Sequence, residues 1–286
     1  MTTFWQAVLN GLGLGSMYLL VSIGLVLVFS VLKIVNFAHG ELLMVASYLV
    51  FIGYVLLNGG VAGTAAITIG GMLVVGLVLY AVVVNPALKR PSINQLVATF
   101  GTAVLLQNLV QLVVGSENRS IPVSHPTVNI FGATIYAPTL IGIAVAVCCI
   151  VLVHAVVRWT EFGIILRAVA QDPVAAAATG IRSQYVAGTV FVAATMLAGI
   201  GGLFLALTYP ISPHVGAEFT LKAFTVAVLA GMGNIAAAGL ISLLLGVGES
   251  LVGVYVGTRA INILAYGILV VVLITRPTGL FRGEDA

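Results

Sequence analysis

Residues 161–182 read EFGIILRAVAQDPVAAAATGIR, and this charged stretch separates two long apolar runs. The chain of 286 residues is 61% hydrophobic and only 7% charged, whereas a soluble domain is about half apolar and about one quarter charged. A water-soluble core cannot bury that much apolar surface, so we expect lipid to surround most of the chain. Residues 161–182 therefore form a polar island in a predicted membrane protein.

The apolar runs on either side of this island define the fold class. A helix needs about 20 apolar residues to cross the hydrocarbon core of a bilayer, and it leaves few backbone groups unpaired in lipid. We predict an all-α polytopic membrane protein, a single transmembrane domain over residues 1–286, with about 8–9 transmembrane helices, some broken or short. The candidate runs are 6–30, 42–58, 61–86, 93–114, 138–157, 186–208, 221–233, 236–256 and 260–275.

The first of these runs and the short run 221–233 differ from ordinary membrane spans. No Lys or Arg precedes the first run, unlike a cleavable signal peptide, so we expect that run to be retained. The run 221–233 is short for a crossing, and a short or Gly-broken segment often marks the translocation path of a transporter.

The basic residues orient the predicted helices in the membrane. If the N-terminus lies outside, the inside segments hold eight of the eleven basic residues: Lys33, Lys89, Arg90, Arg158, Arg167, Arg182, Arg276 and Arg282. The outside segments then hold Arg119, Lys222 and Arg259. This bias agrees with the positive-inside rule. Aromatic residues that favour membrane interfaces fit the same orientation, with Trp5, Tyr136 and Tyr209 near the outer face and Trp159 and Tyr185 near the inner face.

Several classes of function are disfavoured by what the sequence lacks. The sequence has no basic stripe with interleaved aromatic residues, which is the pattern that would indicate nucleic-acid binding. Cys148 and Cys149 are adjacent and have no metal-ligand spacing. The motifs HxxxH and HExxH are absent, and no Ser or Cys nucleophile has an evident base partner. We therefore expect a protein that is not an enzyme and binds neither a metal nor a nucleic acid.

Two elbows are predicted between apolar runs, at residues 34–42 (IVNFAHGEL) and 231–236 (GMGNIA). Each places an Asn, a good N-cap residue, before a new apolar helix. The second elbow also matches GxGxxA, but a membrane-length run follows it, so we reject a dinucleotide site. The candidates for the translocation path and its gating are Asn36, His39, Gly40, Glu41, Gly231, Gly233, Asn234 and Glu249.

The ionisable residues of these regions allow more than one interpretation. Charged groups at membrane depth are costly and often functional, but His39 and Glu41 could both face the aqueous rim, where Glu41 would suit the first turn of a helix. In an ion-coupled secondary transporter, Glu41 and Glu249 would carry protons or sodium ions. In a membrane-embedded enzyme, Asn36, His39 and Glu41 would form the site.

The polar island itself has the pattern of a helix with one apolar face. Phe162, Ile165 and Val169 recur at i, i+3 and i+7, as in a short amphipathic helix. The following dipeptide, Asp172 and Pro173, supplies an N-cap and a proline at the first helical position.

A second short helix is predicted directly after that dipeptide. Residues 173–179 are rich in alanine, and Gly180 suits the position after a helix C-terminus. A plain connector needs about four to six residues, which two helices exceed. The island is therefore either a solvated connector or a docking site for another protein on the inner face.

The chain also resembles a known family, the permease subunits of branched-chain amino acid ABC importers. The resemblance covers essentially the whole chain and rests on NFAHGE at 36–41, RAVAQDPVAAAATGI at 167–181, GMGNIAAAGL at 231–240 and RPTGL at 276–280. It implies that residues 161–182 are a cytoplasmic coupling segment that docks into an ATPase, with helix 173–179 in its groove. The coupling residues would be Arg167, Asp172, Pro173, Ala176 and Gly180. The family pattern before Arg167 is usually more polar than Ile164 and Ile165.

The resemblance further implies partners and a location. These are a second related permease subunit in a heterodimer, two ATP-binding subunits and an extracytoplasmic solute-binding protein, in the inner membrane of a prokaryote. The chain lacks GxxxxGK[ST], so ATP and Mg²⁺ would bind the partner ATPase and this chain would hold no cofactor.

The resemblance also indicates the class of cargo. The implied cargo is a branched-chain or other neutral hydrophobic amino acid, and the alternative is urea or a short amide. Urea-type members tend toward Met where this chain has Phe37, which favours amino acids.

Overall fold

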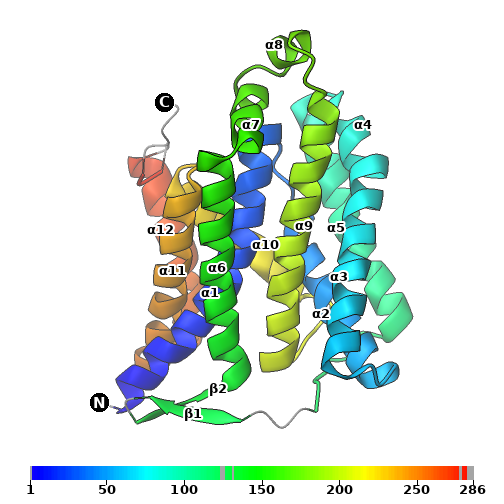
Figure 1. The fold of residues 1–286 in the computed structure, drawn as a ribbon. Coiled ribbons are helices and arrows are strands. Elements are labelled where there is room, and N and C mark those ends of the chain that lie inside the picture. Colours follow the sequence, from blue (N-terminus) through cyan, green and yellow to red (C-terminus); the bar gives the residue numbers. More distant parts are fainter. Residues whose placement is uncertain (1, 123–125, 131, 277–278, 282–286) are drawn as a thin grey trace.

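The computed structural model describes residues 2–122, 126–130, 132–276 and 279–281 and shows a bundle of helices (Figure 1). Within these residues, seven helical spans are long and apolar enough to cross a membrane. They are α1 (Thr2–Leu32), α2 with a π-helical turn (His39–Leu56), α3 through α4 (Gly60–Leu88), α5 (Ser92–Val114), α6 (Ala137–Trp159), α9 (Ser183–Thr208) and α11 (Ile235–Tyr255). Two shorter helices are α10 (Val215–Ala230) and α12 (Arg259–Thr275). The predicted all-α polytopic fold is confirmed.

One small element was missing from the prediction, a two-stranded antiparallel hairpin. Strand β1 (Thr127–Ile130) pairs with β2 (Ala133–Tyr136), and the hairpin lies at the same end of the bundle as the N-terminus (Figure 1). The side-chain amide of Gln6 in α1 makes two hydrogen bonds to the backbone of Thr134 in β2. It donates to the Thr134 carbonyl at 2.8 Å and accepts from the Thr134 amide at 2.9 Å. Strands of four residues are too short to give a clear alternating pattern in the sequence.

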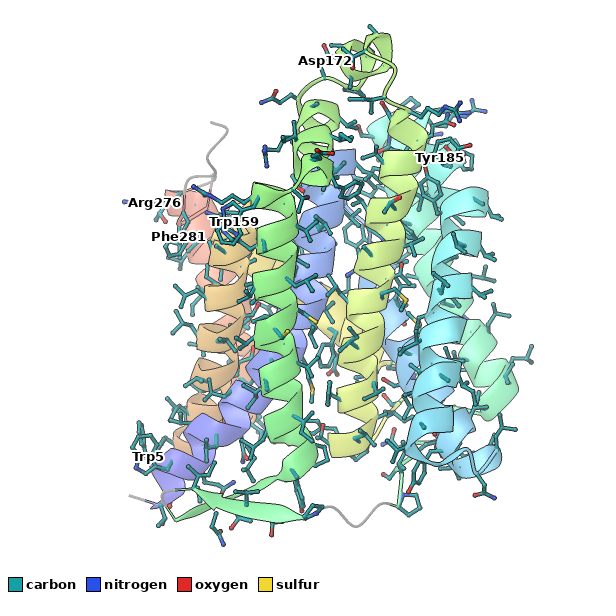
Figure 2. The ribbon with its side chains drawn as sticks, in the orientation of Figure 1. Trp5, Trp159, Asp172, Tyr185, Arg276 and Phe281 are labelled. Carbon is teal, nitrogen blue, oxygen red and sulfur yellow. The ribbon has the colours of Figure 1, made fainter. Side chains whose placement is uncertain are left out.

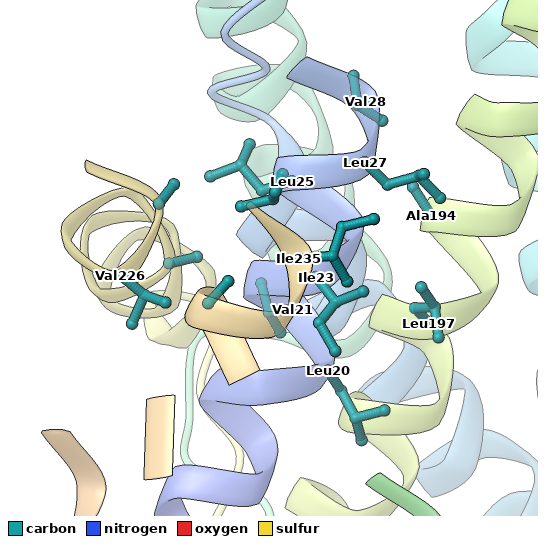
Figure 3. Packing of buried hydrophobic residues seen from close by; sticks show 14 of the residues in the cluster. Leu20, Val21, Ile23, Leu25, Leu27, Val28, Ala194, Leu197, Val226 and Ile235 are labelled. Atoms are coloured by element: carbon teal, nitrogen blue, oxygen red, sulfur yellow. The ribbon is translucent and has the colours of Figure 1, made fainter. Parts of the chain in front are cut away.

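Helix α1 forms the centre of the bundle. Its residues Leu20 and Ile23 are almost fully buried, and they lie between Ala194 of α9 on one side and Val226 of α10 and Ile235 of α11 on the other (Figure 3). Glycines allow α11 to approach α1 closely, because a Cβ atom on Gly15 would lie 2.9 Å from the Cα atom of Leu243. A helix that is apolar all round thus becomes the core around which the others pack.

The two ends of the bundle carry the expected aromatic residues. Trp5 lies at the end with the hairpin, whereas Trp159 and Tyr185 lie at the end with the polar island (Figure 2). Trp159 and Tyr185 are 76% and 69% exposed, as interface anchors are. This arrangement fits the predicted orientation; Arg282, one of the predicted inside cations, lies outside the described residues.

The chain between α1 and α2 is irregular and enters the bundle interior. A Cβ atom on Gly24 would lie 2.6 Å from Nε2 of His39, so α2 starts at the level of Gly24 and not at the end of α1. The eight residues from Gly24 to Leu32 correspond to about 12 Å of helix. Irregular backbone survives at membrane depth only when protein or water covers it, and here Ile34 and Asn36 are 3% and 2% exposed.

Candidate functional site

The polar island contains the predicted amphipathic helix, α7 (Glu161–Gln171). Thr160 caps its N-terminus, because its hydroxyl oxygen accepts a hydrogen bond from the amide of Gly163 at 3.2 Å. Leu166 and Val169 are 3% and 5% exposed and belong to the main core. Arg167, on the outer side of the helix, donates a hydrogen bond to the carbonyl of Val157 near the end of α6. Helix α7 is therefore packed against the bundle and held there by a hydrogen bond.

The second predicted helix of the island is α8 (Pro173–Ala178), which projects furthest from the bundle at this end (Figure 1). Asp172 (labelled in Figure 2) caps it as expected: its carboxylate accepts hydrogen bonds from the amides of Val174 at 2.8 Å and Ala175 at 3.0 Å. Gly180 has the left-handed φ of +89° expected after a helix. The helix ends one residue earlier than predicted.

The exposed side chains of α8 do not include the predicted coupling residue Ala176. Ala176, a predicted coupling residue, is only 6% exposed and packs inward, whereas Val174 is 78% exposed. Residues two apart on a helix point about 200° apart, so the inward position of Ala176 places Val174 outward. Val174 is thus an exposed apolar side chain at the tip of the island that sequence analysis missed.

The first elbow holds buried polar groups. His39 and Glu41 are 0% and 2% exposed, so the interpretation that they face the aqueous rim is wrong. Asn36 does not cap α2. Its side chain accepts a hydrogen bond from the amide of Ala38 at 3.1 Å, and Ala38 is the N-cap, without a side-chain bond. Gly40 lies inside α2.

The start of α2 interlocks with α10. The Gly40 amide donates to the hydroxyl of Thr220 at 3.0 Å, and a Cβ atom on Gly40 would collide with the backbone of Gly216 and Thr220. A Cβ atom on Gly216 would in turn lie 2.9 Å from the Cα atom of Glu41. Glycine on both helices is therefore what permits this contact.

The second elbow follows the prediction more closely. Gly231 and Gly233 have φ angles of +79° and +129°, a region that glycine adopts most readily. Asn234 is the N-cap of α11, and its side chain accepts from the amide of Ala237 at 3.0 Å. The two Asn residues that suggested similar elbows therefore play different roles, with Asn36 in a turn and Asn234 in a cap.

The structure brings the two elbows together. A small apolar pocket between them is lined by Val35 from the first and Met232 from the second, with Phe224 of α10. Phe37 stacks on Phe224, with ring centroids 6.4 Å apart. Helix α10 is thus packed against both elbows.

Glu249 is paired with Lys222, which was predicted to lie in an outside segment. Lys222 of α10 forms an ion pair with Glu249 of α11, and their side chains are 6% and 1% exposed. The Tyr18 hydroxyl donates to the other Glu249 oxygen at 2.8 Å, and the Lys222 ammonium lies 5.2 Å from the Tyr266 ring centroid.

The prediction that Lys222 lies in an outside segment is therefore wrong, because its charge is buried in the bundle. A signal for the pairing was present in the sequence. One cation and one carboxylate, Lys222 and Glu249, each interrupt an otherwise apolar stretch, and such charges are expected to pair.

The described residues contain no cluster of three or more His, Cys, Asp or Glu side chains that could hold a metal ion. The polar groups of the site are instead divided between two places: the exposed island and the buried elbows around α10. An exposed capped helix suits contact with another protein, and buried irregular backbone suits a path through a membrane protein.

These features define a multi-pass membrane permease, and comparison with known proteins agrees. Residues 7–274 match the family model described as "Branched-chain amino acid transport system / permease component", so the chain belongs to that family. Members of it are transport permeases and not enzymes.

Individual relatives align over nearly the full length of the chain. The high-affinity branched-chain amino acid transport system permease protein LivH of Escherichia coli strain K12 is 31% identical, over 97% of this chain and 95% of its own length. The permease protein BraD of Pseudomonas aeruginosa is 31% identical over the same shares. A probable branched-chain amino acid transport permease of Methanocaldococcus jannaschii is 23% identical, over 93% of this chain and 88% of its own.

A solved structure shares the fold. PsaBC from Streptococcus pneumoniae, in complex with Fab, aligns over 97% of this chain and 93% of its own with a TM-score of 0.52. The identity of 12% limits this likeness to architecture.

Proposed function

We propose that this chain is the transmembrane permease subunit of an ATP-driven importer for branched-chain or other neutral hydrophobic amino acids. The observation that carries the proposal is the family match over residues 7–274. The relatives from E. coli and P. aeruginosa are named for branched-chain amino acid transport, which supports this class of cargo. Urea or a short amide is the alternative cargo.

The proposed assembly contains a second related permease subunit, two ATP-binding subunits and an extracytoplasmic solute-binding protein, in the inner membrane of a prokaryote. ATP and Mg²⁺ would bind the ATPase, since this chain has no phosphate-binding motif of the GxxxxGK[ST] type. The island at residues 161–182 would be the coupling segment. The exposed Val174 on a capped helix supports this role, because an apolar side chain at a protruding tip suits insertion into a groove.

The contacts within the chain suggest how motion of the island would reach the membrane interior. Leu166 and Val169 of α7 pack in the same core cluster as α1. Helix α1 runs without a break past both elbows to the opposite end of the bundle (Figure 1). Closure of the ATPase pair would displace α7, shift α1 and bias the elbows between two arrangements.

The same contacts disfavour Glu249 as an ion-binding group of an ion-coupled carrier. Its proposed ion-binding groups were Glu41 and Glu249, but the Glu249 carboxylate is already occupied by Lys222 and Tyr18. A carboxylate neutralised by a buried ammonium group has little tendency to bind a further cation.

Reconstitution tests the proposed function directly. The permease, its related subunit, the ATPase and the binding protein are placed in proteoliposomes with labelled leucine, isoleucine, valine and urea. We expect ATP-dependent uptake of the amino acids. Uptake of urea alone would support the alternative cargo, and flux driven by an ion gradient without ATPase would overturn the proposal.

A further inference from the structure

Four helices meet at the buried Lys222–Glu249 pair. Lys222 comes from α10 and Glu249 from α11, while Tyr18 of α1 donates to Glu249 at 2.8 Å and the ring of Tyr266 in α12 faces the ammonium group at 5.2 Å. Tyr18 also packs edge-on against Phe219 of α10, with ring centroids 5.4 Å apart. The network thus connects α10 to three neighbours through side chains.

Stability alone is a weak reason for a chain to keep such a pair. Desolvation of two buried charges offsets most of their attraction, and apolar replacements of both partners are often as stable as the pair. Removal of one partner, by contrast, leaves a buried charge uncompensated and is strongly destabilising. An ion pair differs from apolar packing in being directional, so it fixes the position of one helix relative to another.

Helix α10 is short and lies between two irregular segments. Its sixteen residues span about 24 Å, less than the roughly 30 Å of the hydrocarbon core. It follows an irregular segment at residues 209–214 and ends at the left-handed Gly231. Thr220 joins it to the start of α2 on one side, and Lys222, two residues later, joins it to α11 on another.

Helix α1 links this network to the polar island. Helix α1 contacts α7 at the end of the bundle that carries the island (Figure 1). Tyr18 lies fourteen residues before Leu32, or about 21 Å along the same continuous helix. A displacement of α1 therefore acts on Glu249 through Tyr18 and on α10 through Phe219.

We propose that the Lys222–Glu249 pair, held by Tyr18, is a tether that makes α10 follow α1, so that Lys222 and Glu249 are positioning residues for coupled transport. This inference rests on the proposed function. Without the tether, α10 and the elbows packed on it no longer move in step with the island. The chemistry of ATP hydrolysis, which lies in another subunit, stays intact.

The test uses the complete reconstituted transporter with the double variant Lys222→Met/Glu249→Gln. Both charges disappear together, so no unpaired charge is left in the bundle. We expect normal assembly and ATP hydrolysis, but about tenfold fewer amino acids taken up per ATP, a size within the usual range for coupling between sites. Tyr18→Phe, which keeps the ring and removes the donor, is expected to lower the same ratio by a smaller factor.

The control is Leu221→Met, which changes an exposed, uncharged side chain of the same helix and leaves both charges of the pair in place; it should leave the ratio unchanged. A normal ratio in the double variant would overturn the inference. Failure of the double variant to assemble would also overturn it, because the pair would then be needed for folding. Uptake by the wild-type complex in the same assay separates this result from failure of the proposed function.

A second measurement reports on position directly. Spin labels at residues 217 of α10 and 255 of α11, with Cys148 and Cys149 replaced by Ala, give the distribution of distances between the two helices. We expect a broader distribution in the double variant than in its parent. Identical distributions would contradict a restraining role.

Discussion

Val174 and Ala176 show how a single residue position decides what a short helix offers to a partner. Both are apolar residues of α8, but Val174 is 78% exposed and Ala176 6% exposed. The alanine packs against its own chain, and the valine is the apolar side chain that is exposed for the proposed contact with the ATPase. Exposure therefore favours Val174 over Ala176 as the residue of the proposed docking surface.

Val174→Asp tests this assignment at the residue scale. A carboxylate placed in an apolar groove would be desolvated without a partner, so we expect loss of ATPase co-purification and at least about a tenfold loss of uptake, equivalent to roughly 1.4 kcal/mol or more. The matched control is Val128→Asp in β1, an exposed valine at the opposite end of the bundle. Undiminished ATPase binding by Val174→Asp would contradict the proposed docking surface.

The cap at Asp172 gives a second residue-scale prediction. Asp172→Ala removes the acceptor for two amides of α8 and should destabilise that helix by about 1 kcal/mol. Asp172→Asn keeps an equally good cap and serves as the control. Amide hydrogen exchange over residues 174–178 measures the effect: faster exchange is expected for the Ala variant only, and equal rates in both would disprove the capping role.

At the scale of elements, helix contacts in this bundle depend on glycine. The backbones of α1 and α11 approach closely at Gly15, and α2 approaches α10 at Gly40 and Gly216. Close backbone approach at small residues is the usual way in which membrane helices associate, because lipid provides no hydrophobic drive between them. Side-chain hydrogen bonds and the Lys222–Glu249 pair then add direction to these contacts.

Gly15→Ala tests the contact between α1 and α11. The added Cβ atom would lie 2.9 Å from Leu243 Cα, so the helices must separate, and we expect a loss of about 1–3 kcal/mol in stability. Gly70→Ala in α3 is the control, since its Cβ atom meets nothing within 4 Å. Thermal unfolding in detergent measures both variants; equal midpoints would refute close packing at Gly15.

At the scale of the whole molecule, the two ends of the bundle have different chemistry. The end with the N-terminus carries the hairpin and Trp5, whereas the other carries α7, α8 and Arg276 (Figures 1 and 2). Cytoplasmic loops are enriched in Lys and Arg, which supports the predicted orientation with the island inside and the hairpin outside. The proposed ATPase and binding protein would then act from opposite faces of the membrane.

Thiol labelling of intact cells tests this orientation. In a chain with Cys148→Ala and Cys149→Ala, we introduce Asn129→Cys in β1 or Thr179→Cys after α8. A membrane-impermeant reagent should label position 129 in intact cells and position 179 only after lysis. The reverse pattern would show that the protein has the opposite orientation in the membrane. It would also contradict docking of the ATPase on the island.

The sequence alone was sufficient for features that depend on neighbouring residues. Apolar runs located most of the helices, and the dipeptide at residues 172 and 173 located the start of α8, because capping and hydrophobicity act within a few residues of the chain. The exception is α10, which spans Val215–Ala230 and not the predicted run 221–233. The left-handed turn at Gly231 and the cap at Asn234 were predictable for the same reason.

Only the tertiary structure decided which distant residues meet. Lys222 and Glu249 are 27 positions apart, and Gly40 and Thr220 are 180 apart, so no local pattern fixes either contact. The burial of His39, the outward position of Val174 and the role of Asn36 also follow from how helices pack against one another. Local chemistry sets where each helix begins and ends, but the contacts that connect the island to the membrane interior arise only when the helices close around α1.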